Sequence, residues 1–337
     1  MNNFPKCVLW SDERSEPLIN QLSTVDARNF REQMKVDGSA LVNVENKKAR
    51  AARLTSGIYH VIAISTDPDY IKSKKKLDAA AEMILSAAYT LDSSYKRSED
   101  RTRRLIHNLK SLTAKIGQEV FYIAQQDLMI NSPRDMVKYV KQEILENSDD
   151  AAKGFVEILK HHAAQKAEYS AFEKLTGKAA GGLPERHDIH RVLMNVFYLF
   201  FGDFVKKKVK AEVERTRLQA LIDYESIHVC IYYIVENASK YTRHGSSFNV
   251  TTAVDKNFLV VRFSMESLEI LPEEVDKIFD EGFSGKKAIE SKLHGAGIGL
   301  YMARAMAQMN GGTLTVVPGR GTGGGYARNT FILALPQ

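Results

Sequence analysis

Three glycines that alternate with other residues stand directly before a predicted helix in the last third of the chain. Gly295, Gly297 and Gly299 belong to the segment HGAGIGLYMARAM. Backbone N–H groups at a helix start bind anions, and glycine lets the backbone approach a phosphate closely. Lys286 and Lys287 lie in the preceding loop, where their charge is suited to neutralise a phosphate. The segment predicts a phosphate site. Tight turns share this pattern, and the polar loop before it argues against a dinucleotide-binding motif.

An asparagine and a lysine close an apolar helix that we expect over residues 231–242, with the sequence IYYIVENASKYT. The side-chain oxygen of Asn237 is a hard, neutral ligand, which Mg²⁺ accepts while it keeps waters and phosphate oxygens. Lys240 follows three residues later on the same helical face and can reach the same phosphates. Asn237 is therefore a candidate metal ligand. The alternative is an ordinary helix end with a favourable lysine.

One histidine on a long predicted helix could act as a nucleophile. His107 lies between Leu105 and Leu109, which occupy an apolar seam, so its imidazole faces partly outward. At about pH 7 a neutral imidazole has a free lone pair that can attack a γ-phosphate. A lone helical histidine is usually only a surface residue, so the elements around it must decide.

Apolar residues follow a 4-3-4-3 spacing over about 40 residues, from Leu77 to Ile116. The pattern predicts a helix over about 74–130, roughly 80 Å long, which needs a partner along its seam. Pro133 precedes a second helical segment, about 135–175. Two such helices make an antiparallel hairpin, and two hairpins make a dimeric four-helix bundle. A self-contained coiled coil is the alternative.

The elements divide into three predicted domains. Residues 1–70 form a small mixed α/β segment with β-rich runs and no chemical motif. Residues 74–176 form the helical hairpin, and glycines between 177 and 184 supply a linker. Residues 185–337 alternate strand and helix, as expected of an α/β sandwich. The expected fold class is therefore α+β.

Composition excludes several classes of protein. With 337 residues, 44% hydrophobic and 26% charged, the chain is neither disordered nor fibrous. Cys7 and Cys230 are too few for a disulfide framework or a cysteine-ligated zinc site. We find no secretory signal and no membrane span, and expect a cytoplasmic protein without membrane contact. Nucleic-acid binding through the lysine runs at 72–76 and 206–208 is a lesser alternative, because runs this short are usually solvated faces.

Three segments together resemble, in order and spacing, the asparagine, phenylalanine and second glycine boxes of sensor histidine kinases. They are residues 237–241, 277–283 and 295–300. The resemblance covers about residues 185–337 and implies a GHKL-type ATPase domain with ATP and Mg²⁺ as cofactors. It implies that nucleotide is held by Asn237, Lys240, Tyr241, Phe279, Phe283, Lys286, Lys287, Gly295, Gly297, Gly299 and Leu300.

The resemblance extends through the hairpin to about residue 77, because His107 lies where the family has its phosphoacceptor. Asn108 follows it where the family usually has an acidic residue that serves as base. An amide cannot take the proton, and general-base catalysis contributes about 10²–10⁴ in rate. Ser111 occupies a position that in related kinases positions water for dephosphorylation of the response regulator, and Tyr233 replaces the first residue of the asparagine box.

The first glycine box is degenerate. The strand at 258–263 leads to Met265, where the family usually has an aspartate that accepts a hydrogen bond from the adenine amino group. Ser267 and Glu269 replace the glycines of this box. Loss of a charge-assisted hydrogen bond costs about 1.5–3 kcal/mol, or about ten- to hundredfold in affinity. Glu266 is the neighbouring carboxylate that would have to substitute.

The resemblance thus implies a cytoplasmic, homodimeric histidine kinase of two-component signalling. ATP would phosphorylate His107, and the phosphoryl group would pass to an aspartate of a response-regulator receiver domain on a separate chain. The alternative is a catalytically degenerate phosphotransfer or scaffold protein that no longer binds ATP. The altered first glycine box favours this alternative, and the intact second glycine box disfavours it.

Overall fold

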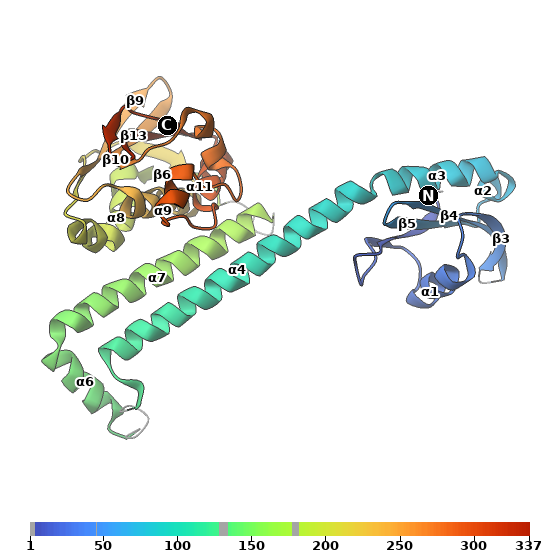
Figure 1. The fold of residues 1–337 in the computed structure, drawn as a ribbon, viewed down its shortest axis with the longest axis horizontal. Helices are drawn as coiled ribbons and strands as arrows, with labels where there is room; N and C mark the ends of the chain where they lie inside the picture. The colour runs from blue at the N-terminus through green and yellow to red at the C-terminus, as the bar shows by residue number, and fades with distance from the viewer. Residues whose placement is uncertain (1–3, 45, 128–133, 177–181) are drawn as a thin grey trace. The chain divides into compact units, whose positions relative to one another are not determined.

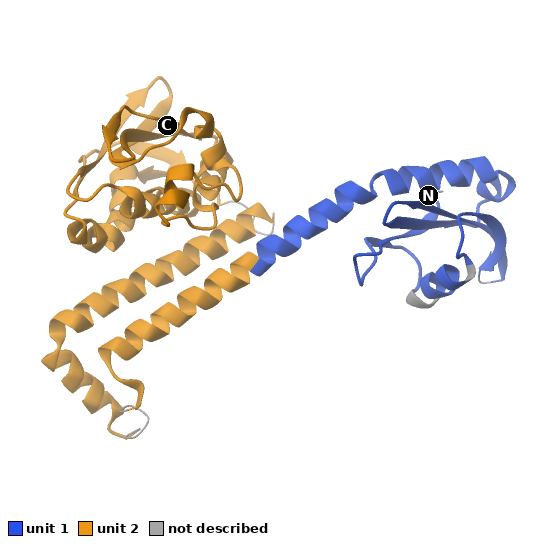
Figure 2. Ribbon diagram, viewed as in Figure 1, with its two compact units in different colours: residues 1–103 blue, residues 104–337 orange. Residues whose placement is uncertain are grey.

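The computed structural model describes residues 4–44, 46–127, 134–176 and 182–337 (Figure 1). It divides into two compact units, residues 1–103 and 104–337 (Figure 2). The predicted helix breaker Pro133 and the linker glycines Gly177 and Gly181 lie outside the described residues.

The first unit is built on an antiparallel five-stranded sheet with the strand order β2-β1-β5-β4-β3. The β-rich runs predicted at 7–10, 40–44 and 59–64 are confirmed as parts of β1, β3 and β5. Strand β4 and helix α1 were not predicted. The elements are β1 (Lys6–Ser11), β2 (Ile19–Asn20), α1 (Thr24–Gln33), β3 (Gly38–Val44), β4 (Lys47–Ser56), β5 (Tyr59–Ser65), α2 (Pro68–Lys72) and α3 (Lys74–Ser86).

A helix covers each face of this sheet and buries residues of its central strands. Leu77 on α3 packs with Val61 in one apolar cluster, and Phe30 on α1 packs with Ile62 in another. Neighbouring residues of β5 point to opposite faces, so one strand contributes to both clusters. This explains why β5 is almost continuously apolar rather than alternating.

The predicted helical hairpin is confirmed, although both of its arms are interrupted. The first arm breaks at Ala87 between α3 and α4, and the second breaks at Asn147 between α6 and α7. The hairpin helices of the second unit are α4 (Ala88–Ile123, whose first residues belong to the first unit), α6 (Met136–Glu146) and α7 (Ser148–Leu175).

Helices α4 and α7 run antiparallel, side by side (Figure 1). Asn108 bonds to Glu168, and Thr113 accepts from Gln165, so the partner number on α7 falls as the number on α4 rises. Apolar side chains of both helices stay exposed in the single chain: Ile106, Val120, Phe121, Phe155, Val156 and Leu159.

The rest of the second unit is a two-layer α/β sandwich, which confirms the predicted fold class. Helices α8, α9 and α11 share one apolar core with a sheet of strand order β11-β13-β10-β9-β7. The elements are β6 (Glu185–Asp188), α8 (Ile189–Lys206), β7 (Lys210–Val213), β8 (Gln219–Ile222), α9 (Tyr224–Tyr241), β9 (Ser247–Asp255), β10 (Phe258–Leu268), α10 (Lys286–Glu290), α11 (Gly299–Met309), β11 (Thr313–Val317), β12 (Gly321–Gly323) and β13 (Tyr326–Pro336), with 3₁₀ turns at Pro272–Glu274 and Lys277–Phe279.

Two smaller expectations concern apolar residues. Cys230 is fully buried in the core of α9, as predicted. Within the described ranges, none of the helices combines the length and the apolar character that a bilayer span requires.

Candidate functional site

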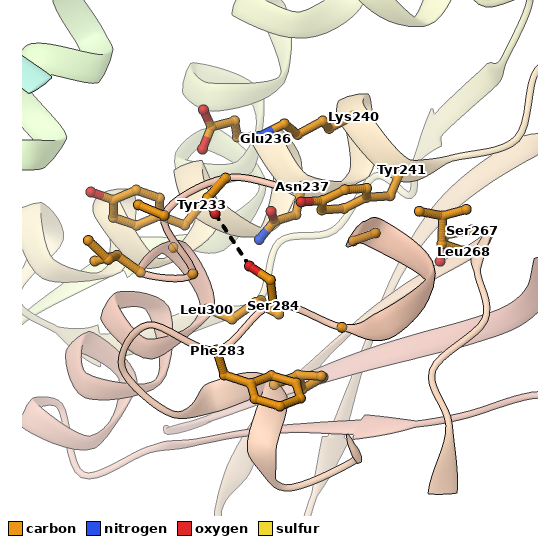
Figure 3. A pocket seen from close by; sticks show the side chains of 18 of the residues that line it. Tyr233, Glu236, Asn237, Lys240, Tyr241, Ser267, Leu268, Phe283, Ser284 and Leu300 are labelled. Carbon is orange, nitrogen blue, oxygen red and sulfur yellow. Dashed lines mark hydrogen bonds between the residues drawn. The ribbon is translucent and has the colours of Figure 1, made fainter. Parts of the chain in front are cut away.

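Helix α9 carries Asn237 and Lys240 at its C-terminal end. Asp223 caps the start of the helix, and its carboxylate accepts from the backbone N–H of Glu225 at 3.2 Å. Apolar residues such as Cys230 and Ile234 then fix its buried face in the core. The partly exposed end that follows presents Asn237 and Lys240 to a cavity (Figure 3).

The glycine segment forms the facing wall of that cavity. Gly299 opens α11, as predicted. Gly297 has φ +69°, and a Cβ there would lie 2.4 Å from the carbonyl oxygen of Phe283. Its own carbonyl accepts from the N–H of Gly282 at 3.0 Å, and Ser284 Oγ donates to the carbonyl of Gly295 at 3.3 Å (Figure 3). Only glycine permits this close backbone approach at position 297.

The cavity has a volume of about 480 Å³ and brings together residues from distant parts of the second unit. Helix α4 contributes the exposed His107 and its neighbours, and α9 and the glycine segment contribute the opposite walls. The candidate residues that line it are His107, Asn108, Ser111, Asn237, Lys240, Tyr241, Phe283, Gly295, Gly297, Gly299 and Leu300.

Three candidate residues lie outside the cavity lining. Phe279 is buried beneath Arg304, whose guanidinium lies 3.6 Å from the centre of the ring. Lys287 Nζ pairs with Glu290 at 2.9 Å on the short helix α10. Lys286 opens the same helix, and its backbone N–H donates to Glu274 at 2.8 Å. Direct nucleotide contact by these three residues remains a prediction.

The end of the cavity opposite Tyr233 and Glu236 is formed by β10, which continues to Leu268 through the degenerate glycine box. Met265 is buried and lines the cavity. Ser267 also lines it and accepts from the buried Asn329 at 3.0 Å. The continuous pairing of β10 with β13 follows from replacing glycines by residues with side chains.

Glu266 does not occupy the position that Met265 leaves without a carboxylate. Its Oε1 accepts from Arg243 at 2.7 Å and from Thr322 at 2.6 Å. These hydrogen bonds hold the pKa of Glu266 below its usual value. Because successive residues of a strand face opposite sides, Glu266 points away when Met265 faces the cavity.

Four glutamates line the cavity, and two of them, Glu168 and Glu236, come from helices α7 and α9 and were not singled out from the sequence. Glu168 on α7 accepts from Asn108 Nδ2 at 3.3 Å and from Tyr233 Oη at 3.2 Å. Glu236 precedes Asn237 on α9. Burial raises the pKa of both carboxyls, and the charge of Glu168 adds to the rise at Glu236.

The side chains that line the cavity include oxygen ligands for a divalent cation. Among the residues that the structure describes, no group of three or more His, Cys, Asp or Glu side chains is arranged to hold a metal ion. Mg²⁺ does not need such a cage, because it is commonly held by one or two protein oxygens, waters and substrate phosphates. Asn237, with Glu236 beside it in the cavity wall, fits that mode of binding.

Parts of the chain are similar to known proteins. Residues 222–337 match the family described as histidine kinase-, DNA gyrase B-, and HSP90-like ATPase. Sensor histidine kinase WalK of Bacillus subtilis (strain 168) is 31% identical over 105 residues, which are 30% of this chain and 17% of WalK. Histidine protein kinase SaeS of Staphylococcus aureus (strain USA300) is 31% identical over 85 residues, which are 25% of this chain and 24% of SaeS.

The chain therefore spans less than a quarter of the length of these two relatives. Among solved structures, a mycobacterial sensor histidine kinase, MprB, aligns with a TM-score of 0.39 and 19% identity, over 45% of this chain and 97% of that one.

Proposed function

We propose that the chain is a sensor histidine kinase, which phosphorylates His107 with Mg²⁺-bound ATP and passes the phosphoryl group to an aspartate of a separate response regulator. The match of residues 222–337 to the histidine kinase-, DNA gyrase B-, and HSP90-like ATPase family and the similarity to WalK and SaeS support this proposal. The observation that carries the proposal is the shared cavity, in which His107 faces the same space as Asn237 and the glycine segment. A cytoplasmic location is part of the same proposal.

Some residues of the cavity would bind the phosphates and the metal, and His107 would attack the γ-phosphate. The backbone of the glycine segment and the ammonium of Lys240 would bind the phosphates, and Lys240 Nζ lies 3.3 Å from the Cβ position of Gly295. Asn237 would hold Mg²⁺, which neutralises charge on the phosphates when it is bound. His107 is exposed, so its imidazole is free to approach a γ-phosphate in this cavity.

Association into a homodimer through the hairpin is part of the proposal. The apolar side chains that α4 and α7 leave exposed form a surface that a second hairpin would bury. The expected mass in solution by light scattering is that of two chains. A single-chain mass at micromolar concentration would contradict the four-helix bundle.

The direct experiment is incubation with γ-labelled ATP and Mg²⁺, comparing the wild type with His107→Ala and Asn237→Ala. We expect acid-labile, base-stable label on the wild type and none on either variant. Label that persists on His107→Ala would exclude His107 as the acceptor.

One observation favours a second candidate function, a phosphotransfer or scaffold protein that does not bind ATP. Met265 is buried at the end of the cavity where the family has its adenine-binding aspartate. Titration with a fluorescent ATP analogue, with and without Mg²⁺, separates the two functions. The absence of binding at millimolar nucleotide would favour the scaffold.

A further inference from the structure

The carboxylate of Glu168 lies where three helices of the second unit meet. It projects from α7, accepts from Asn108 of α4 at 3.3 Å and accepts from Tyr233 of α9 at 3.2 Å. It lines the same cavity as His107, the residue next to Asn108. Each of its oxygens is therefore held by a donor from a different helix, which fixes the carboxylate beside the His107 segment.

On the basis of the proposed function, we propose that Glu168 accepts the proton that the His107 imidazole releases when it is phosphorylated, and that Asn108 and Tyr233 orient the carboxylate for this step. Glu168 would thus supply the base that position 108 does not provide.

One ring nitrogen of His107 forms the bond to the γ-phosphorus of ATP, while the bond from that phosphorus to the bridging oxygen breaks and its electron pair leaves with ADP. The imidazole would otherwise become a cation, because its other nitrogen still carries a proton. That proton passes to Glu168, which leaves a neutral phosphorylated ring and a protonated carboxyl.

The charged and hydrogen-bonding groups around Glu168 suit it to accept a proton. The charge of Arg104 on α4 acts on Glu168, and Tyr233 of α9 donates to it. The charges of Glu236 and Glu168 interact, and His107 and Lys115 of α4 line the same cavity. Tyr233 stays a donor, because burial raises its pKa well above the usual value. Burial also raises the pKa of Glu168, although both hydrogen bonds and Arg104 oppose the rise. A carboxyl with a raised pKa retains more basicity at about neutral pH than an exposed one.

Glu236, the lining carboxylate whose charge interacts with that of Glu168, is less suited to the step. It directly precedes Asn237, and the charge of Lys240 acts on it. Its place is therefore beside the proposed metal and phosphate ligands. Glu168 is the carboxylate in contact with the His107 segment.

The test uses the full chain and the variant Glu168→Gln, which keeps the shape of the side chain and resembles the protonated acid. At about pH 8 we expect its initial rate of labelling from γ-labelled ATP to be about 100-fold lower than that of the wild type, or lower still. The ratio of the two rates should fall toward one as the pH is lowered through the carboxyl pKa, because the wild type then also carries a protonated side chain. A purely structural contact would leave the ratio independent of pH.

Three variants complete the design. Glu173→Gln changes another carboxylate of α7 that does not line the cavity, and should label at the wild-type rate. Tyr233→Phe removes one donor, so its rate should fall less than that of Glu168→Gln and keep the wild-type pH dependence. Asn108→Asp combined with Glu168→Gln returns a carboxylate to the His107 segment and should recover most of the lost rate. Thermal unfolding and nucleotide titration show that each variant is folded and binds ATP.

The outcomes distinguish this inference from the proposed function. If the wild type is labelled at His107 and folded Glu168→Gln is labelled equally fast, or slower by a factor that does not vary with pH, Glu168 is not the proton acceptor and the kinase function stands. If the wild type takes no label, or if His107→Ala keeps it, the proposed function fails and this inference fails with it.

Discussion

Replacement of Gly297 by alanine should weaken nucleotide binding without unfolding the second unit. The residue has φ +69°, a conformation that costs an L-amino acid about 1–2 kcal/mol. The new Cβ would also lie 2.4 Å from the carbonyl oxygen and 2.7 Å from the nitrogen of Phe283, both of which are backbone atoms that cannot rotate away. The segment must therefore shift to relieve the contact.

Only the unshifted conformation presents its backbone to phosphate, so the affinity falls with the population of that conformation. The strain alone predicts a loss of affinity of about 5- to 30-fold, and the overlap adds to it.

Titration with a fluorescent ATP analogue measures the loss of affinity. Gly295→Ala is the matched control in the same segment, because its Cβ meets only the flexible end of Lys240, at 3.3 Å. Gly245→Ala, outside the cavity, has φ +75° and open space, so chemical denaturation of this variant measures the cost of the backbone conformation without an overlap. Wild-type affinity in a folded Gly297→Ala protein would refute the reasoning.

Three other predictions follow from the geometry. His107 and Asn237 of one chain line one cavity, so we expect phosphoryl transfer within each chain. Mixed dimers of His107→Ala with Asn237→Ala should then take almost no label. Labelling at about half the wild-type rate would indicate transfer between chains. Inosine triphosphate should bind within about threefold of ATP, because Met265 offers no carboxylate to an adenine amino group; a preference for ATP above about tenfold would contradict this. Burial raises the pKa of Asp92, but hydrogen bonds from Tyr59 and Arg14 and the charge of Lys96 lower it overall. Asp92→Asn should therefore lower the free energy of unfolding at about pH 7 by about 2 kcal/mol. The difference between wild type and variant, measured by chemical denaturation, should shrink below about pH 4, where the carboxyl of the unfolded chain becomes protonated. A difference that does not change with pH would exclude the ion pair as its source.

Patterns within one segment could be predicted from the sequence. The heptad spacing identified the first hairpin arm, and the helical segment after Pro133 predicted the second. The breaks at Ala87 and Asn147 carry neither proline nor glycine and gave no signal. Strand β4 was missed because its sequence, KKARAARLTS, is rich in lysine, arginine and alanine, which are weak strand formers. Its pairing on both sides, with β3 and β5, overrides that preference.

In the site, too, only groups that are close in the sequence could be predicted. The spacing of Asn237 and Lys240 and the glycines before α11 were predicted, because each group lies within one turn of a helix or one loop. Glu168 was not predicted. Its partner Asn108 lies 60 residues earlier and Tyr233 lies 65 residues later, so only the packing of α4, α7 and α9 reveals that they meet. The signal available in the sequence was the presence of carboxylates on the second hairpin arm.

Two departures from the family pattern, at Asn108 and Tyr233, converge on one carboxylate. Considered separately, an amide after the phosphoacceptor and a tyrosine at the start of the asparagine box each suggest lost chemistry. In the structure both side chains donate hydrogen bonds to the carboxylate of Glu168. Helix α7 thus supplies the negative charge that these two positions do not carry. The base-binding end has no comparable compensation, because Glu266 is engaged with Arg243 and Thr322. A degraded kinase would be expected to lose groups at both ends of its cavity. Beside the His107 segment, both oxygens of Glu168 accept hydrogen bonds, so we expect the chemistry of phosphoryl transfer to persist where recognition of the base is relaxed.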